Sequence, residues 1–336
     1  MNYDIITIGD VMRDIFVFPD LSDMEKPVSD EEIESKEPFD KFLVFGLGDK
    51  IDISDVSFSV GGTAANVAVG LGKAGFNTGL ISAVGGDSVG SELVLDIKAK
   101  KVGVENLKIY KNRKSSFSVI VSYKGERTIF VYHAFKPSDF VLPKEITANW
   151  VYLGPMAQGF EDIYNQVTSE IVKKNLKVAI NPGSVQINRG LESLGGLKRL
   201  MEVIFLNREE AHIMSGLSGT PQIKDIMKVI SFSGPKTVVI TDGKEGAYVY
   251  SEEKFLKVGI YPGHRIDATG AGDAFSTGFL AARMKELPLQ ECLKWGVVNS
   301  ASVVGKIGAQ EGLLSSNTIK KKVKEYRWPA ESLRFS

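Results

Sequence analysis

Short runs rich in Val and Ile alternate with longer segments of helical period from about Thr63 to the end of the chain, and this alternation restricts the fold more than any other feature. The expected strands are 79–84, 177–180, 203–206 and 237–241, and the expected helices between them include 88–101 and 208–214. Strands and helices in repeated succession are typical of a mainly parallel sheet with helices on both faces. The sequence therefore predicts one α/β domain over residues 1–336, a three-layer α/β/α sandwich.

Two stretches depart from the alternation and predict a second, smaller sheet. Residues 19–40 are acidic, contain three prolines and lack an apolar period, so we expect a surface loop there. The expected strands of the small sheet are 42–45, 51–60, 117–123 and 128–133. Pieces this short cannot bury a core of their own. We therefore expect approximately 15–60 and 115–135 to form a lid over the ligand crevice of the main domain.

Composition narrows the classes of partner. Lys and Arg together number 41, as do Asp and Glu, so the formal net charge is zero and no long-range field favours nucleic acid or an anionic membrane. Cys292 is the only cysteine, which excludes a disulfide framework and a cysteine zinc site; we expect it to be a buried helical residue. No apolar run is long enough to cross a bilayer, and the first residues do not resemble a leader. We expect a cytoplasmic protein with small-molecule partners.

The most specific motif is Asp-Ala-Thr-Gly-Ala-Gly-Asp at 267–273, which opens a helix of small and apolar residues. Amides at a helix start bind anions, because they lack intrahelical acceptors and the helix dipole adds positive charge there. Asp273, in the first turn, would then lie beside a bound phosphate and could accept a hydroxyl proton. The simpler interpretation is a tight turn and a helix cap. The length of the motif favours the functional interpretation.

Two further groups could bind a polyol. Gly61 and Gly62 leave a strand and let a ligand approach the backbone closely, and Asn66 offers both a donor and an acceptor to hydroxyl groups. Asp10 and Asp14 follow the first expected strand, and ligands of open α/β sheets bind outside the carboxyl ends of strands. Ordinary turn chemistry and solvated loop acids explain these residues equally well when each is taken alone.

Other sequence patterns do not predict a dinucleotide site, a Walker-type site or a histidine metal site. The Gly-x-Gly-x-x-Gly string at 70–75 follows the helical run 64–69 instead of a strand, so we expect helix packing there and not a dinucleotide site. No Gly-x₄-Gly-Lys-Ser/Thr sequence is present, so a Walker-type kinase is not supported. The histidines lack metal-binding spacing; they are His133, His212 and His264.

With these motifs in order, the chain resembles the PfkB, or ribokinase-like, family of carbohydrate and nucleoside kinases. Residues 61–68 resemble the first signature of that family and 267–273 the second. The resemblance implies a ribokinase-like fold in which Asp273 is the catalytic base. It also implies an anion hole for the transferring phosphoryl group, formed by the amides of Gly270, Ala271 and Gly272. The residues that it assigns to the acceptor are Asp10, Asp14, Gly61, Gly62 and Asn66.

The resemblance extends to the nucleotide side. Asn-x-x-Glu at 207–210 resembles the element that organises Mg²⁺ and its waters, which implies that Glu210 holds the metal of MgATP through water. A helix start enriched in acids is the simpler explanation. Residues 239–247 resemble the nucleotide-binding turn, and Asn299 with 308–310 resembles the last nucleotide segment. The ATP-binding residues implied are Asn207, Thr241, Gly243, Gly246 and Asn299. A monovalent cation such as K⁺ near the 267 loop is also compatible with the family.

The acceptor is where the sequence departs from ribokinases proper. Asp10 and Asp14 are spaced more widely than the usual Asn-x-Asp pair, and Asn181 replaces an Asp common in the family. Our leading hypothesis is a kinase of a free sugar or sugar acid. An adenosine-type nucleoside kinase is the alternative, with a base stacked on lid aromatics such as Phe42, Phe45, Phe58 or Phe117. A phosphosugar would need cations, for which the candidates are Lys124, Arg127 and Lys136.

Hypotheses from other classes stay open at this point. A non-catalytic ligand-binding protein could keep the fold, although an intact Asp273 motif argues against it. A dinucleotide-dependent oxidoreductase is the weakest alternative. The edges of a lid sheet are usually covered, so we also expect a homodimer formed through the lid.

Overall fold

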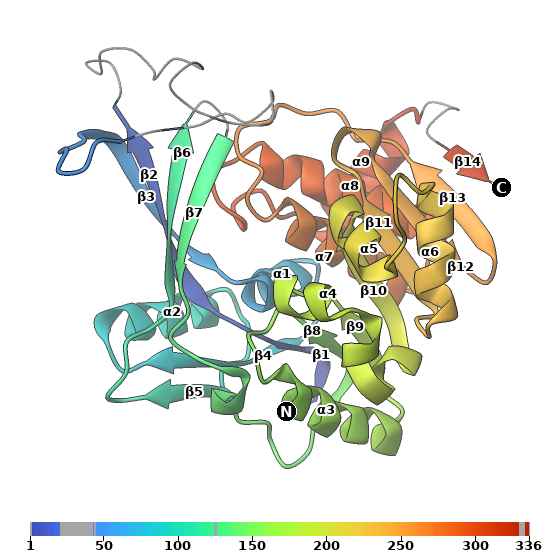
Figure 1. Ribbon diagram of the computed structural model, residues 1–336, viewed down its shortest axis with the longest axis horizontal. Coiled ribbons are helices and arrows are strands. Elements are labelled where there is room, and N and C mark those ends of the chain that lie inside the picture. Colours follow the sequence, from blue (N-terminus) through green and yellow to red (C-terminus); the bar gives the residue numbers. More distant parts are fainter. Residues whose placement is uncertain (1, 21–42, 44, 124–125, 329–332, 336) are drawn as a thin grey trace.

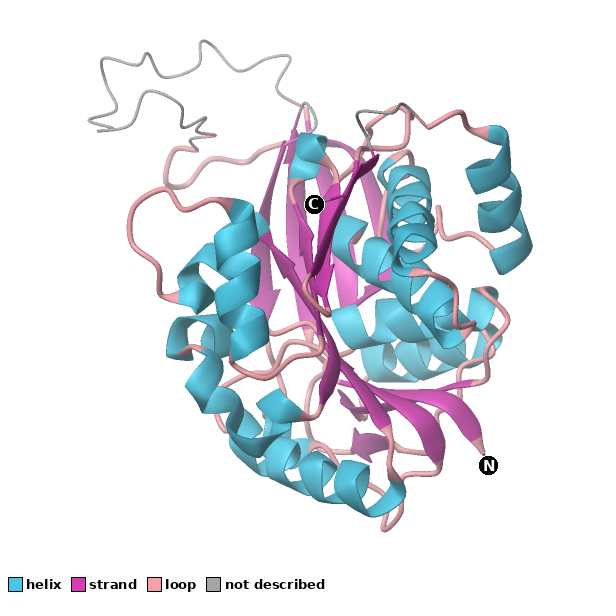
Figure 2. Ribbon diagram, turned by 90° about the vertical axis from the view of Figure 1, so that its right-hand side faces the viewer, coloured by secondary structure: helices cyan, strands magenta, loops and turns pink. Residues whose placement is uncertain are grey.

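The structure is a computed structural model that describes residues 2–20, 43, 45–123, 126–328 and 333–335. Within these ranges the chain forms one large sheet with helices on both faces and one small sheet that projects from it (Figure 1, Figure 2). The predicted surface loop 19–40 beyond Asp20, together with Phe42 and Lys124, lies outside the described residues. Every described helix is too short or too polar to span a membrane.

The large sheet confirms the predicted parallel architecture. Its described strands are β1 (Tyr3–Ile8), β4 (Thr78–Gly85), β5 (Leu107–Tyr110), β8 (Ala148–Leu153), β9 (Lys177–Ile180), β10 (Met201–Asn207), β11 (Thr237–Thr241), β12 (Ala247–Ser251), β13 (Lys254–Val258) and β14 (Leu333–Phe335). Their order in space is β14-β13-β12-β11-β10-β9-β8-β1-β4-β5. In this spatial order, neighbouring strands from β11 through β1 to β5 pair in parallel. Strands β12, β13 and β14 add an antiparallel edge.

Helices cover both faces of this sheet. One face carries α1 (Thr63–Lys73), α2 (Ser88–Ala99), α7 (Ala271–Met284), α8 (Leu289–Val304) and α9 (Ser316–Glu325). The other carries α3 (Phe160–Lys174), α4 (Ser184–Arg189), α5 (Arg208–Ser215) and α6 (Ile223–Phe232), with the 3₁₀ segment η2 (Leu191–Arg199). Short 3₁₀ turns, η1 (Pro137–Asp139) and η3 (Gly243–Glu245), lie in connections.

The two faces explain why the strands are continuous apolar runs. In β10, Val203 and Phe205 pack under α7 and α8, while Ile204 and Leu206 pack under the helices of the opposite face. Successive side chains of a strand point to opposite faces, so a sheet covered on both sides needs apolar residues at every position. The Val and Ile runs from which we predicted strands are therefore a direct consequence of the three layers.

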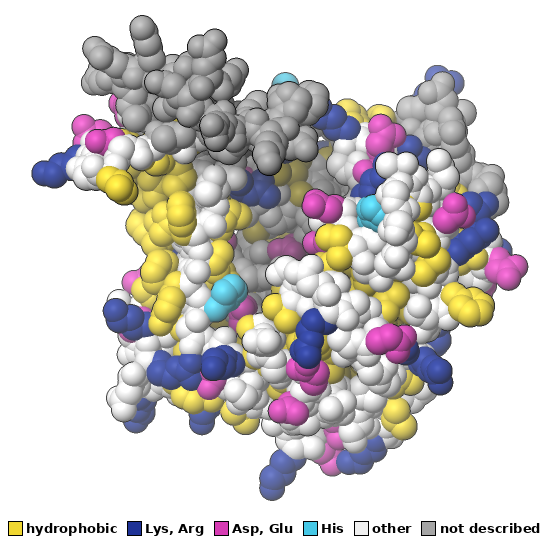
Figure 3. Space-filling model, viewed as in Figure 1, with side chains coloured by type: hydrophobic (Ala, Val, Ile, Leu, Met, Phe, Trp, Pro, Cys, Tyr) yellow, Lys and Arg dark blue, Asp and Glu magenta, His cyan; other side chains and the backbone are white. Residues whose placement is uncertain are grey.

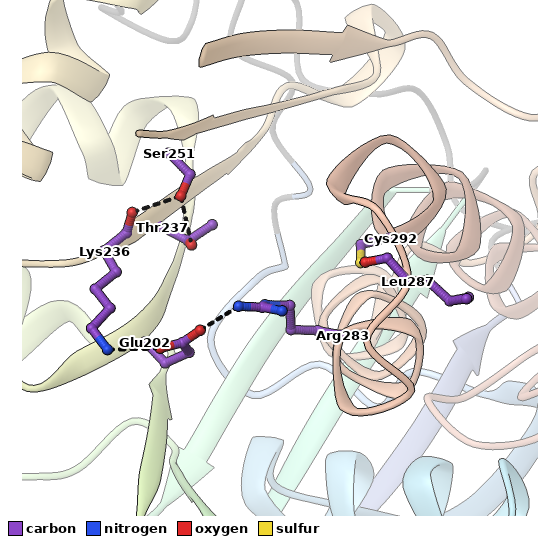
Figure 4. Close-up of polar contacts among 7 residues, drawn as sticks. All are labelled: Glu202, Lys236, Thr237, Ser251, Arg283, Leu287 and Cys292. Carbon is purple, nitrogen blue, oxygen red and sulfur yellow. Dashed lines mark hydrogen bonds and ion pairs between the residues drawn. The ribbon is translucent and has the colours of Figure 1, made fainter. Parts of the chain in front are cut away.

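Helix α7 is fixed near its far end by ion pairs to the buried Glu202, shown in Figure 4. Glu202 of β10 lies 3.2 Å from Lys236 and 2.5 Å from Arg283, which is near the end of α7. Burial raises the pKa of Glu202, but hydrogen bonds from the two cations outweigh this and hold the pKa below its usual value. Close by, the buried Cys292 donates to the Leu287 carbonyl, as expected for a structural cysteine. The start of α7, with Asp273, is therefore carried on an anchored helix.

The small sheet, which we call the lid, consists of β2 (Met12–Pro19), β3 (Ile53–Gly61), β6 (Phe117–Tyr123) and β7 (Glu126–Tyr132) in the order β3-β2-β6-β7. Its hairpin β6–β7 was predicted, and so was β3. The lid also contains a strand that the sequence analysis did not foresee as such, since Asp14 lies within β2 and not in a loop. The expected strand 42–45 was wrong for its described residues, Leu43 and Phe45, which lie outside any strand.

The register of the lid gives it two chemically different faces. Asp14 lies between Ser59 and Ser118, so these polar side chains share one face. Neighbouring positions place apolar side chains on the opposite face, and its exposed members are Val56, Phe58, Phe117, Phe130 and Tyr132. We call these the polar face and the apolar face of the lid. Figure 3 shows hydrophobic side chains gathered on the lid and a hollow between it and the main domain.

Candidate active site

Asp273 lies in the first turn of α7, with its carboxylate held by a second helix. Its Oδ2 accepts a hydrogen bond of 2.7 Å from Nδ2 of Asn66, which is in the first turns of α1. Burial raises the pKa of Asp273, and hydrogen bonds from Asn66 and Thr63 offset part of this rise. The structure therefore brings together two residues that the sequence analysis assigned to the base and to the acceptor.

The loop before α7 has the geometry expected of an anion site. Gly270 caps the helix in a left-handed conformation (φ 73°), and a Cβ there would come within 2.3 Å of Ala309. Asp267 holds the loop: its carboxylate accepts from the amide and hydroxyl of Thr269 and from the amide of Gly308. Among the described residues the Gly272 amide has no acceptor, whereas the Ala271 amide donates to the Ala268 carbonyl at 3.2 Å. The amides of Gly270 and Gly272, neither of which has an acceptor among the described residues, are thus ready to bind an anion.

The paired glycines bring the lid close to the start of α1. An added Cβ at Gly61 would lie 2.1 Å from Oδ2 of Asp14, and one at Gly62 would lie 2.3 Å from the Asp10 carbonyl. Gly62 also has φ 95°, which favours glycine. Both glycines are therefore required by close contacts with the residues predicted to bind the acceptor.

Asp14 lies near Asp273, whereas Asp10 contacts the end of the lid. Burial is the main reason that the pKa of Asp14 rises to about 6, and the negative charge of Asp273 adds to the rise. The Asp14 carboxylate accepts a hydrogen bond of 2.6 Å from Ser118. Asp10 lies 3.2 Å from Nδ1 of His133, at the end of the lid hairpin, and this hydrogen bond raises the pKa of His133. His133, for which the sequence indicated no metal-binding role, is half-exposed and contacts a candidate acceptor residue.

A cavity of about 370 Å³ lies beside the start of α7. Predicted nucleotide residues line it, namely Thr241, Gly243 and Gly246, together with Ala271 and Gly272 of the candidate anion hole. Its remaining lining residues were not foreseen; they are Lys244, Ile260, Tyr261, Gly263, Arg265, Ala268, Phe275, Val297, Ser300, Ala301 and Val304. The mixture of an apolar wall and two cations suits a base with phosphates.

Asn299 does not line this cavity, which corrects the expectation that it lies beside adenine. Its side chain is fully buried, donating to the Ala274 carbonyl at 2.7 Å and accepting from the Leu314 amide at 3.0 Å. The cavity is instead lined by Val297, Ser300, Ala301 and Val304, at helical spacing on one face of α8. That spacing was visible in the sequence, but the direction of the face was not.

A second cavity, of about 120 Å³, adjoins the first and contains Asp273. Thr241 and Gly272 line both cavities, and Asn207, Glu210 and Asn181 line the second. Asn207 and Glu210 form a capping box for α5: the Glu210 amide donates to Oδ1 of Asn207, and the Asn207 amide donates to Oε2 of Glu210, both at 2.8 Å. The simpler explanation of this motif is therefore correct for the helix, and it leaves Oε1 of Glu210 free of that capping box.

The second cavity offers the carboxylate of Glu210 to Mg²⁺. No cluster of three or more His, Cys, Asp or Glu side chains capable of holding a metal occurs in the described part of the chain. Mg²⁺ bound with a nucleotide normally keeps several waters and uses one or two carboxylates. One carboxylate, Glu210, beside Asp273 and the free amide of Gly272 meets that requirement. Burial raises the pKa of Glu210, and the negative charge of Glu209 adds to the rise.

Comparisons with known proteins identify the family of the chain and several of its relatives. The sequence model described as pfkB family carbohydrate kinase matches residues 39–316. The nucleoside kinase of Methanocaldococcus jannaschii is 26% identical over 270 residues, which are 80% of this chain and 86% of that protein. The ribokinase of Haemophilus influenzae is 25% identical over 275 residues, 79% of this chain and 88% of that protein.

A solved structure of low sequence identity has the same fold. The crystal structure of the M. jannaschii nucleoside kinase, an archaeal member of the ribokinase family, has a TM-score of 0.75 with this chain at 22% identity. The match covers 97% of this chain and 100% of that one. The fold, the order of the two glycine-rich motifs and the family match over residues 39–316 agree, and the chain therefore belongs to the pfkB family of carbohydrate kinases.

Proposed function

We propose that the protein transfers the γ-phosphoryl group of ATP to a hydroxyl of a small polyhydroxylated acceptor. ATP occupies the larger cavity, and the acceptor lies between Asp273 and the polar face of the lid. The observation that carries the proposal is the position of Asp273, which adjoins the free amide of Gly272 in the same helical turn. A proton acceptor beside an anion-binding helix start supplies two requirements of phosphoryl transfer to a hydroxyl.

Each group has one task in this mechanism. Asp273 receives the hydroxyl proton, and the amides of Gly270, Ala271 and Gly272 stabilise negative charge on the transferring phosphoryl group. The Ala271 amide is engaged by Ala268 in the structure and must release that carbonyl to take part. Mg²⁺, when bound with ATP, supplies charge neutralisation on the phosphates, and Glu210 fits as its outer carboxylate through water, beside Asn207.

The charges beside Asp273 favour a neutral acceptor. The Asp14 carboxylate lies near Asp273, while Arg13, the cation next to Asp14, is paired with two acids of α2 at 3.0 and 3.3 Å. Carboxylates accept hydrogen bonds from hydroxyls, but they repel an anionic group. A free sugar therefore fits better than a sugar acid or a phosphosugar.

A nucleoside is the second candidate. The M. jannaschii relative is named a nucleoside kinase and the H. influenzae relative a ribokinase, and both kinds of acceptor contain a ribose ring. The expected stacking of a base on Phe58 or Phe117 loses its support, because both belong to the apolar face of the lid and Phe117 packs on Tyr132 there. On the polar face, Ile129 and Val131 are the exposed apolar side chains available to a base.

A homodimer through the lid is part of the proposal. Five large apolar side chains are exposed on the apolar face of the lid, the most exposed being Phe58 at 62% and Phe130 at 63%. Monomeric proteins rarely expose a continuous patch of this kind. A second copy suits it, since two apolar sheet faces can pack on each other about a two-fold axis and a chain of zero formal net charge does not repel its own copy.

ADP release over a panel of free sugars, sugar acids, sugar phosphates and nucleosides tests the proposed function. We expect the fastest release with a neutral sugar, and the fastest release with a nucleoside would select the second candidate. Tight ligand binding without ADP release from any acceptor would replace both with a non-catalytic ligand-binding protein. Repeating the assay with Na⁺ in place of K⁺ tests the role of a monovalent cation. We expect ADP release to be faster with K⁺.

A further inference from the structure

The hydrogen bond between Asn66 and Asp273 is the last link of a longer chain of side chains. Oδ1 of Asn66 accepts from Nε2 of Gln310 at 2.8 Å, and Oε1 of Gln310 accepts from Nζ of Lys100 at 2.5 Å. Lys100 is the C-cap of α2, and Gln310 lies between α8 and α9. Four residues from four separate parts of the sequence thus form one line from a cation to the candidate base.

The chemistry of the two ends fixes the orientation of both amides. An ammonium group can only donate, so Gln310 must turn its oxygen toward Lys100 and its nitrogen toward Asn66. Asn66 must then present its oxygen to Gln310 and its nitrogen to Asp273, which accepts through its carboxylate. Every link agrees with the orientation that the contacts give. The two amide dipoles therefore align, each with its positive end toward Asp273.

Burial strengthens this alignment. Asn66 is 4% exposed and Gln310 is 5% exposed, so water does not compete for their amide groups. In such surroundings hydrogen bonds polarise one another along a chain. A charge on Lys100 makes the Gln310 amide a better donor, and this in turn makes the Asn66 amide a better donor to Asp273.

We propose that Lys100, Gln310 and Asn66 form a positioning relay that holds Asp273 through Oδ2 and orients its carboxylate to receive the acceptor proton. The relay rests on the proposed function, in which Asp273 is the base. Asn66 then has one Nδ2 hydrogen left for the acceptor, because Asp273 takes the other and Gln310 occupies its oxygen. Asn66 serves the acceptor chiefly as a donor, and not equally as donor and acceptor as the sequence suggested.

The relay affects the pKa of Asp273, because the described titratable groups near that carboxylate do not supply a positive charge. Within the described part of the chain, Asp14 of β2 and Tyr152 of β8 respond to the charge of Asp273, and Glu210 of α5 lines the same cavity; none of these three is a cation. If the hydrogen bond from Asn66 is lost, Thr63 is the side chain that still donates to the Asp273 carboxylate. Loss of the relay should therefore raise the pKa of Asp273 and move the acid limb of the rate profile to higher pH.

Gln310→Glu separates a relay from a structural contact. The new carboxylate keeps its shape and gains an ion pair with Lys100, but it cannot donate to Asn66. We expect kcat to fall by about tenfold or more, with the KM for ATP unchanged and the acid limb shifted to higher pH. Lys100→Met should lower kcat by about threefold and shift the acid limb in the same direction. Lys100→Arg, which keeps the positive charge, should retain activity. Lys98→Met, an exposed lysine of the same helix, is the matched control.

Two reference measurements keep the outcomes distinct. Rates are taken with the acceptor of the panel that gives the fastest ADP release, and the carboxyl ¹³C signal of Asp273, identified by its loss in Asp273→Asn, is titrated without any acceptor. The relay is overturned if Gln310→Glu and Lys100→Met match Lys98→Met in kcat, acid limb and ¹³C titration while Asp273→Asn is inactive. Full activity of Asp273→Asn would instead remove the proposed function, and the relay as a catalytic device with it.

Discussion

Nδ2 of Asn66 lies 2.7 Å from Oδ2 of Asp273, although 207 positions separate the two residues. Four residues after each of them, Gly70 meets Thr277, and a Cβ at Gly70 would lie 2.6 Å from Cγ2 of Thr277. Residues four apart share a helix face, so these are consecutive contacts along the packing of α1 on α7. The missing side chain at Gly70 lets the two helices approach closely enough for Asn66 to reach the candidate base.

Gly70→Ala should therefore disturb both stability and activity. Overpacking against the buried Thr277 costs about 1–3 kcal/mol, which exceeds the gain of about 0.5–1 kcal/mol that alanine brings to a helix interior. We expect a lower free energy of unfolding in denaturant titrations and a lower kcat. Gly72→Ala, whose Cβ would lie 3.4 Å from its nearest neighbour, is the control. Adding Thr277→Ala to Gly70→Ala should restore activity, and a double variant as impaired as the single one would contradict this account.

Asp273→Asn should retain ATP binding and lose at least about a hundredfold in kcat, because the amide keeps the shape but cannot accept the proton. ATP affinity by calorimetry and steady-state ADP release measure the two quantities separately. Asp162→Asn, which alters an exposed acid in the first turn of α3, is the matched control. Near-normal turnover by Asp273→Asn would exclude it as the base.

Asp14 should couple stability to pH. Its pKa rises from 3.8 to about 6 on folding, so the native state binds a proton in that window more strongly than the unfolded chain does. Stability is therefore lost as pH rises through the window, by on the order of 3 kcal/mol. Asp14→Asn removes this dependence, so its advantage in melting temperature over the wild type should grow from pH 3.8 to about 6 and then level off.

The same substitution should weaken acceptor binding. An ionised Asp14 accepts hydrogen bonds from acceptor hydroxyls, so the wild-type KM for the acceptor should rise as pH falls below about 6. Asp14→Asn should show a high KM at every pH. A stability advantage that does not vary with pH, or an unchanged KM, would be inconsistent with a buried carboxylate in this role.

The lid dimer should depend on the apolar face of the lid. Phe130→Glu places a charge on that face, and burying it against a second copy is unfavourable, so sedimentation should show monomers. Phe232→Glu is the control, since Phe232 is 97% exposed on α6 of the main domain. A wild-type protein that sediments as a monomer at every concentration would refute the dimer.

Local patterns predicted those features that depend on neighbouring residues. The apolar runs gave the strands, since a strand buried on both faces needs apolar side chains at each position. The glycines around 270 and Asp273 were identified because an anion-binding helix start has a short local code. In contrast, Phe58 and Phe117, which were candidates for stacking on a nucleoside base, belong to the opposite face, because the register between β2, β3 and β6 decides the face.

The sequence by itself determined the α/β class, the two glycine-rich motifs and the candidate base, because each is written in consecutive residues with a local physical reason. Only the tertiary structure decided which groups surround that base. The relay from Lys100 through Gln310 to Asn66, the structural role of Asn299 and the contact of His133 with Asp10 all join residues distant in sequence. Their meeting depends on how helices and lid pack on the sheet, and packing distances of a few ångströms leave no trace in the order of residues.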